Sequence, residues 1–97
     1  MQKVRNNPSF GSNLRSLRKA AGMTQEQVVI KLQLLGHDIT RSIYSQFECG
    51  IYNIRIDELI ALKHIFGVSY DDFFLPLEKE QSVSKDRVRS EERFSRN

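Results

Sequence analysis

The chain has 97 residues, 39% of them hydrophobic, which is enough for one compact domain with a modest core and too few for two independently folded parts. Its 15 Lys and Arg residues against 12 Asp and Glu residues give a formal net charge of +3, which permits a polyanionic partner without requiring one. The single cysteine, Cys49, excludes an internal disulfide and a structural zinc site built from several thiolates.

Positive charge is concentrated in the first part of the chain. Residues 1–41 are rich in Lys and Arg, which are opposed there only by Glu26 and Asp38. No apolar run approaches the ~20 residues that a membrane-spanning helix needs, and no signal-type apolar segment follows the basic start. We therefore expect a soluble protein of the reducing cytoplasm, without a membrane association.

The first helix is expected shortly after the start of the chain. Residues 1–8 show no hydrophobic periodicity and are predicted to form a flexible N-terminal arm. Pro8 and Ser9 then favour a helix start, with Ser9 as the N-cap. Apolar residues at the spacing of one helical face follow: Phe10, Leu14, Leu17 and Ala21. Gly22 suits the left-handed position that ends a helix.

A second helix is predicted over residues 24–35. Thr24 and Gln27 have the spacing of a capping box, in which each side chain accepts a hydrogen bond from the other residue's backbone N–H. The expected buried stripe consists of Val28, Leu32 and Leu35. Gly36 ends this helix.

The third helix is predicted over residues 40–48, with Thr40 as its N-cap and Gly50 beyond its end. On a helical projection it has two distinct faces. The apolar arc holds Ile43, Tyr44 and Phe47, and the opposite side holds Arg41, Ser42, Ser45, Gln46 and Glu48. The outer face is therefore small, polar and rich in hydrogen-bonding groups.

The rest of the chain predicts two more helices and a tail. Leu59, Leu62 and Ile65 indicate a helix over residues 56–66, and the Val68–Phe73 segment has the capping pattern of a short fifth helix. No segment alternates like a strand, so the expected fold is an all-α, five-helix bundle spanning residues 9–75. Residues 76–97 are mostly charged or polar and are predicted to be a tail, disordered or bound to a partner.

Two helices joined by a short connection, the second with a polar outer face, are what a protein needs to enter the major groove of DNA. An arginine near the start of such a helix can donate two hydrogen bonds to guanine, and an amide can pair with adenine. Arg41 and Gln46 are therefore the candidate base readers, and Ser42 and Ser45 suit either bases or phosphates.

An ordered set of short motifs carries a family resemblance. It comprises Leu-Arg at 17–18, Gly-Met-Thr-Gln at 22–25, Ile-Thr-Arg-Ser at 39–42, Phe-Glu at 47–48, Gly50, Asn53 and Gly-Val-Ser at 67–69. In this order and spacing, residues 14–74 resemble the Cro and lambda-repressor-like helix-turn-helix family, also called the XRE type. The resemblance implies a five-helix domain that binds specific sites in double-stranded DNA, a role in transcriptional control, and frequently a homodimer. We expect the regulator to be a repressor.

The resemblance also assigns roles to residues. It places Gln25 on a phosphate at the start of the second helix and Asn53 on the DNA backbone, with Tyr52 and Arg55 as weaker candidates. The remaining positions that it places at the DNA are Thr40, Arg41, Ser42, Ser45 and Gln46. Arg18 and Glu48 match a structural ion pair that joins the first and third helices.

The sequence departs from the family pattern between Thr24 and Thr40, where it is longer by about five residues, or somewhat more than one helical turn. Two explanations remain open. Residues 33–35 either extend the second helix, so that the third docks normally, or the turn has opened and the third helix meets the groove at another angle.

Other functional classes find less support in the sequence. It contains no nucleophile paired with a base, no glycine-rich phosphate loop and no cluster of metal ligands, so we expect no enzyme activity, no metal and no cofactor. A protein-interaction module could use Ile51, Tyr52 and Ile54. An antitoxin of a toxin-antitoxin pair could combine DNA binding with a protein partner held by residues 76–97.

Overall fold

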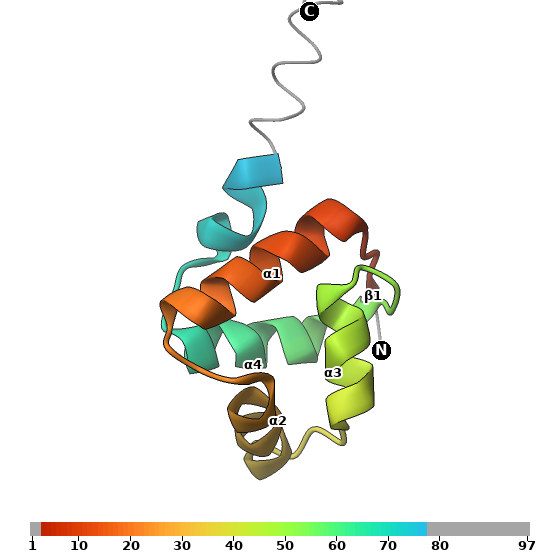
Figure 1. Ribbon diagram of the computed structural model, residues 1–97, viewed down its shortest axis with the longest axis vertical. Helices are drawn as coiled ribbons and strands as arrows, with labels where there is room; N and C mark the ends of the chain where they lie inside the picture. Colours follow the sequence, from red (N-terminus) through yellow and green to blue (C-terminus); the bar gives the residue numbers. More distant parts are fainter. Residues whose placement is uncertain (1–2, 78–97) are drawn as a thin grey trace, which may run out of the picture.

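The computed structural model describes residues 3–77 (Figure 1). In this part of the chain it contains five helices and almost no strand, which confirms the predicted all-α fold. The helices are α1 (Pro8–Ala20), α2 (Gln25–Leu34), α3 (Arg41–Glu48), α4 (Ile56–Phe66) and a last helix over residues 70–77. Two short strands, β1 (Lys3–Val4) and β2 (Ile54–Arg55), complete the fold. None of the described helices is both long and apolar enough to cross a membrane.

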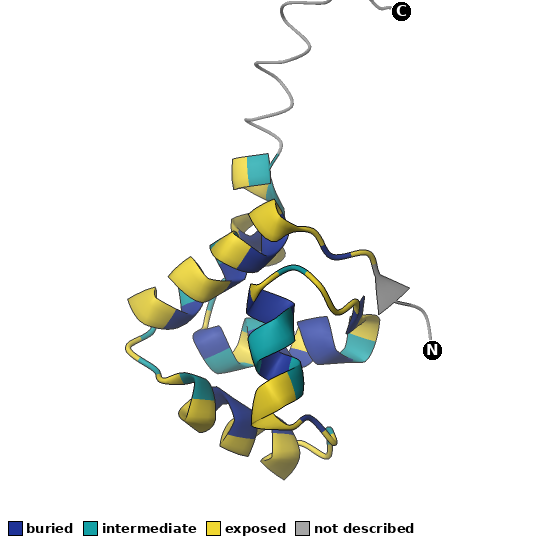
Figure 2. Cartoon of the chain, turned by 45° about the vertical axis from the view of Figure 1, so that its right-hand side comes forward, coloured by how far each residue is buried: buried dark blue, intermediate teal, exposed yellow. Residues whose placement is uncertain are grey.

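The core lies where the helices meet. Helix α3 packs against α1 and α2, and α2 packs against α4. The largest fully buried side chains come from each of the five helices and from β2: Leu14, Val28, Leu32, Tyr44, Phe47, Ile54, Leu62 and Phe73. Figure 2 shows the buried stretches of the helices turned toward one another and the exposed stretches turned outward. The predicted stripe of α2 is wrong at Leu35, which is 56% exposed because the helix ends at Leu34; Val29 is buried instead.

Local side-chain caps set the starts of the helices. The Thr24 hydroxyl accepts a hydrogen bond from Gln27 N at 3.1 Å, and Gln27 Oε1 accepts one from Thr24 N at 2.9 Å, so the predicted capping box is present. The predicted N-cap at Ser9 is wrong. Asn7 caps α1 by accepting from Phe10 N at 2.8 Å. Pro8 has no N–H to satisfy and its fixed φ suits the first helical position, so α1 begins earlier than expected.

The N-terminal segment is held in place over residues 3–8, contrary to the predicted flexible arm. Strand β1 pairs with β2 in an antiparallel ladder that aligns Lys3 with Arg55. Asn6 is buried, and its Nδ2 donates to the carbonyl oxygens of Phe47 at 2.8 Å and Tyr52 at 3.0 Å. These carbonyls lie at and beyond the end of α3, where a helix leaves acceptors without an intrahelical donor. The segment thus closes the end of α3.

Two glycines allow the backbones of α1 and α3 to touch. A Cβ atom at Gly11 would lie 2.6 Å from the Glu48 carbonyl oxygen and 2.7 Å from Gly50 N. Gly50 has a φ of 78°, a conformation that side chains disfavour, and a Cβ there would overlap the carbonyl group of Asn7. The position of α3 on α1 therefore depends on direct backbone contact.

The helix over residues 70–77 covers the other side of α1. Phe73 is fully buried and stacks on Phe10, with ring centroids 6.2 Å apart. Asn13 Nδ2 donates to the Phe73 carbonyl oxygen at 2.9 Å. This helix continues past residue 75, where we expected the domain to end. The rest of the predicted tail, residues 78–97, lies outside the described residues.

Candidate nucleic-acid interface

Helix α3 presents its polar face to the surrounding solvent. Thr40 Oγ1 accepts from Ile43 N at 3.1 Å and starts the helix, as its role as N-cap predicts. Tyr44, Phe47 and Glu48 are buried and anchor the inner face. The outer face consists of the exposed Arg41 and Ser42 and the partly exposed Ser45 and Gln46. The projection was wrong for Glu48 alone, because this carboxylate turns inward to an arginine.

Arg18 and Glu48 form a buried ion pair between α1 and α3. Arg18 Nε donates to Glu48 Oε2 at 2.6 Å, and Arg18 Nη2 donates to Glu48 Oε1 at 3.2 Å. Their side chains are only 10% and 4% exposed. Arg18 Nη1 also donates to the carbonyl oxygen of Met23 at 2.8 Å, which ties the turn before α2 to the same arginine. Three segments thus meet at one guanidinium.

The electrostatics of this pair favour the charged forms. Burial by itself raises the pKa of the Glu48 carboxyl, but hydrogen bonds from Arg18 and Gln25 outweigh burial, so the pKa lies below its ordinary value. The hydrogen bond to Glu48 raises the pKa of Arg18 against the opposite effect of burial. Burial, and then the negative charge of Glu48, raise the pKa of the neighbouring Tyr44 phenol. The pair is therefore ionised in the folded protein at neutral pH.

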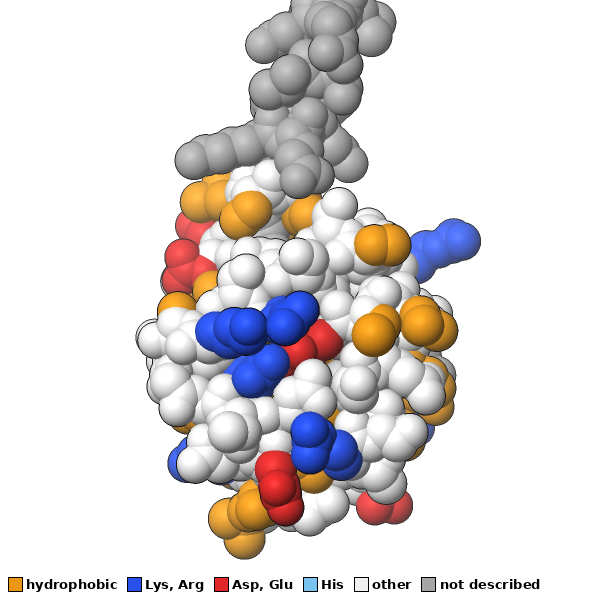
Figure 3. Space-filling view, viewed as in Figure 1, with side chains coloured by type: hydrophobic (Ala, Val, Ile, Leu, Met, Phe, Trp, Pro, Cys, Tyr) orange, Lys and Arg blue, Asp and Glu red, His pale blue; other side chains and the backbone are white. Residues whose placement is uncertain are grey.

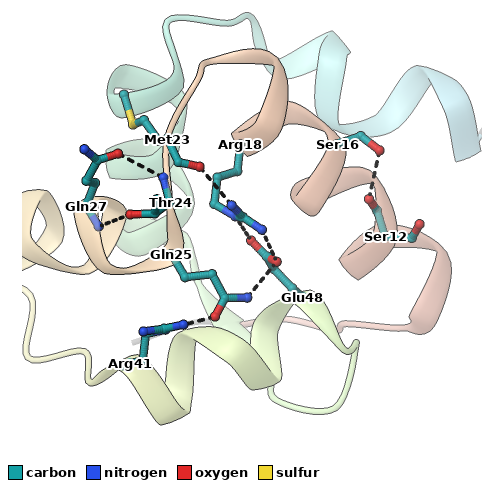
Figure 4. A network of polar contacts seen from close by, with 9 residues as sticks. All are labelled: Ser12, Ser16, Arg18, Met23, Thr24, Gln25, Gln27, Arg41 and Glu48. Carbon is teal, nitrogen blue, oxygen red and sulfur yellow. Dashed lines mark hydrogen bonds and ion pairs between the residues drawn. The ribbon is translucent and has the colours of Figure 1, made fainter.

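Gln25 connects the buried pair to the outer face. Its Nε2 donates to Glu48 Oε1 at 2.9 Å, and its Oε1 accepts from Arg41 Nε at 3.1 Å (Figure 4). The side chain expected to contact a phosphate is therefore engaged by two protein groups, one on each side of its amide. The backbone at the start of α2 still offers the positive end of a helix dipole to an anion.

Asn53 lies beyond α3 and is exposed, but its side chain also serves the fold. Its Oδ1 accepts from Asn6 N at 3.0 Å. The Nδ2 of Asn53 donates no hydrogen bond within residues 3–77, so it is available on the surface beside α3. Sequence analysis missed Asn6, which joins Asn53 and the end of α3 to the N-terminal segment; the Asn-Asn-Pro string at residues 6–8 was its only local signal.

The long connection between α2 and α3 combines a helix that continues through Gln33 to Leu34, as the first explanation expects, with a connector over residues 35–40. Helix α2 continues to Leu34, and Gly36, with a φ of 91°, ends it. The turn is closed by a hydrogen bond from His37 N to the Leu32 carbonyl oxygen at 3.0 Å, and Gln33 Nε2 donates to the Ile39 carbonyl oxygen at 3.1 Å. The added length is thus absorbed by α2 and a pinned connector, and α3 still packs on both α1 and α2.

The surroundings of the outer face are mixed in character. Figure 3 shows several basic side chains on the face that carries α1, α2 and α3, with acidic side chains next to them. Of the apolar residues expected at a protein interface, Ile51 is 73% and Tyr52 42% exposed, but Ile54 is buried because β2 turns it into the core. No three His, Cys, Asp or Glu side chains among residues 3–77 are grouped as a metal site requires.

Comparison with known proteins gives one match. The sequence profile of a helix-turn-helix family matches residues 14–73, which is more than half of the chain. The match begins within α1 and ends in the last helix, so it includes α2, α3 and the whole hydrogen-bond network between them. No significant match was found among curated proteins or among solved structures.

Proposed function

This chain belongs to the Cro and lambda-repressor-like family of helix-turn-helix proteins, and from that premise we propose that it is a repressor that reads a specific DNA site with α3. The family supplies a DNA-binding domain of the transcription-regulator type. The proposal includes four further points. They are the reading of the major groove, the repressor role, a homodimer on a two-fold site and a cytoplasmic location.

The observation that carries the proposal is the division of α3 into an anchored face and a free one. Its inner face is fixed by buried Tyr44, Phe47 and Glu48, so the helix cannot rotate to bury its polar side. The outer side chains are short or end in amide or guanidinium groups, which suit base edges. A helix fixed in this way positions its outer groups in advance, as direct readout requires.

Arg41 is the central reader in this proposal. Gln25 Oε1 accepts from Arg41 Nε, and this is the only hydrogen bond of the Arg41 side chain within the described residues. Both terminal nitrogens therefore remain for the two acceptors that guanine presents in the major groove, O6 and N7. Gln46 suits adenine, while Ser42 and Ser45 can reach bases or phosphates.

Phosphate contacts would supply the affinity that does not depend on sequence. We assign them to the start of α2 near Gln25, to the Thr40 hydroxyl, which accepts within its cap and can still donate, and to Asn53 Nδ2. Binding through such contacts weakens as salt rises, because each phosphate contact releases condensed cations.

A second candidate function rests on Ile51, whose side chain is 73% exposed directly after α3. Together with Tyr52 it could hold a protein partner, either in an interaction module or in an antitoxin whose C-terminal residues bind a toxin. Such association would depend little on salt, which separates it from DNA binding.

The test is a selection from random duplex DNA at two salt concentrations, carried out with the intact protein and with Arg41→Ala and Gln46→Ala. We expect one enriched, two-fold symmetric site, and each substitution should cost about 1–3 kcal/mol and relax the preference at one base pair. Lys19→Ala is the matched control: it removes an exposed cation of α1 and should leave the site preference unchanged. No enriched site at low salt, with the fold intact by circular dichroism, would refute the proposal.

A further inference from the structure

The amide group of Gln25 has one permitted orientation. Its Nε2 donates to Glu48 Oε1 at 2.9 Å, and its Oε1 accepts from Arg41 Nε at 3.1 Å. Figure 4 shows this amide lying between the carboxylate and the guanidinium. An ionised carboxylate can only accept and an arginine Nε can only donate. Turning the amide over would place oxygen against oxygen and nitrogen against nitrogen, so its two neighbours together select the observed orientation.

Glu48 is the fixed end of this chain of hydrogen bonds. Arg18 donates to it twice, through Nε at 2.6 Å and Nη2 at 3.2 Å, and the pair is ionised. The Glu48 side chain is only 4% exposed, so little water reaches it to replace Gln25 as a donor. Arg41 is the free end, because it is exposed and Gln25 supplies the only hydrogen bond of its side chain within residues 3–77. The buried carboxylate therefore determines which atom of Gln25 faces Arg41.

We propose that Glu48 is a positioning residue for base readout, which acts through Gln25 to hold the guanidinium of Arg41. The inference rests on the proposed reading of DNA by α3. Glu48 is buried on the inner side of that helix, so its effect reaches the outer face only through the two side chains between. With Nε bound, the guanidinium is restrained and its two terminal nitrogens stay free for one base.

The arrangement predicts both the size and the place of the effect. A long side chain that is ordered before binding avoids an entropic cost equivalent to about two- to tenfold in affinity. Within the described part of the chain, Gln25 makes no hydrogen bond to the other outer side chains of α3, so the benefit applies to Arg41 alone. Loss of the orientation should therefore weaken discrimination at one base pair. A merely structural role of Glu48 would instead weaken binding to all sequences alike.

Glu48→Gln tests the proposal because it changes hydrogen-bond polarity and keeps the shape of the side chain. Arg18 Nε is the closer of the two donors, so the oxygen of the introduced amide should face Nε and its NH2 group should face Gln25. Gln25 must then turn over to accept, which sets its own NH2 group against Arg41 Nε. In the selection from random duplex DNA, preference at the Arg41 base pair should fall about two- to tenfold. Preference at the Gln46 base pair should stay.

Three further variants separate orientation from stability. Gln25→Met keeps the ion pair but removes the amide, and it should weaken the same base pair as Glu48→Gln. Arg18→Lys loses the two-pronged bond and destabilises the fold, but it keeps Glu48 ionised, so the Arg41 preference should be retained. Glu26→Gln is the matched control, since it removes an exposed carboxylate from the first turn of α2. It should leave every base preference unchanged.

A second measurement needs no DNA. In heteronuclear NMR spectra of the free protein, the Arg41 Nε–Hε signal should exchange slowly with water in the intact chain and in Arg18→Lys. It should exchange rapidly in Glu48→Gln and Gln25→Met, each first shown to be folded by circular dichroism.

Two kinds of result would overturn the proposal. One is an unchanged Arg41 signal or an unchanged base preference in Glu48→Gln or Gln25→Met. The other is an Arg41 preference that follows the free energy of unfolding across the variants, with Arg18→Lys losing it as well. If the intact protein enriches no DNA site, the proposed function fails, and the NMR comparison still decides whether Glu48 orients Arg41.

Discussion

Removing one partner of the Arg18–Glu48 pair should destabilise the protein more than removing both. In Arg18→Met, the Glu48 carboxylate stays 4% exposed and keeps only the hydrogen bond from Gln25. In Glu48→Met, the Arg18 guanidinium keeps only its bond to Met23. Each variant buries an uncompensated charge, which costs about 3–5 kcal/mol.

The double variant Arg18→Met/Glu48→Met leaves no buried charge at this position. It loses the bonds to Met23 and Gln25, at about 1 kcal/mol each, and gains apolar contact. We therefore expect it to be about 1–2 kcal/mol less stable than the intact protein, well below the sum of about 6–10 kcal/mol for the two single variants.

The assay is urea unfolding followed by circular dichroism at 222 nm, with the free energy of unfolding taken at a common urea slope. Because a small domain has only about 5–15 kcal/mol of stability, a single variant can be unfolded at low urea, and a stabilising osmolyte then brings its transition into range. Single variants within 1 kcal/mol of the intact protein, or a double variant as unstable as the sum, would refute the account of a buried, mutually compensating pair.

Three further predictions concern the end of α3 and the segments that contact it. Gly50→Ala should destabilise the protein by well over the ~1 kcal/mol expected for Gly22→Ala. Both glycines have a positive φ, but only at Gly50 would a Cβ atom overlap other backbone atoms, those of Asn7 and Pro8. Equal urea midpoints for the two variants would contradict the close contact. Asn6→Ala should cost about 1–3 kcal/mol and speed amide exchange near Tyr52. Stability should fall as pH drops below the ordinary Glu48 pKa of about 4.5, because the folded-state pKa is lower; Glu48→Gln should flatten this acid limb.

The parts of the fold that sequence predicted are those set by neighbours along the chain. Thr24 and Thr40 each accept a hydrogen bond from the backbone N–H three residues ahead, so their roles as N-caps can be predicted from spacing alone. The N-cap of α1 was predicted at Ser9 and lies at Asn7, although Pro8 at the first helical position is a local signal for Asn7. Leu35 was misjudged because apolar spacing does not show where a helix leaves the core.

Contacts between distant segments could not be predicted in the same way. Asn6 binds Phe47 across 41 residues of sequence, and the β1–β2 ladder is too short to show alternation. Gly11 resembles any glycine in a helix until the end of α3 is placed against it. Gln25 was expected at a phosphate, and its bonds to Glu48 and Arg41 follow only from the packing of α2 on α3.

The backbone contact at Gly11 also bears on how such a protein can acquire new targets. Because α3 rests on α1 through main-chain atoms, the helix keeps its position when its outward side chains are exchanged. Arg41, Ser42, Ser45 and Gln46 can then vary one at a time, by point mutation or by design, and each exchange alters local chemistry without shifting the others. A side chain at Gly11 would instead displace all four together. Under the proposed function, this glycine therefore permits stepwise change of specificity.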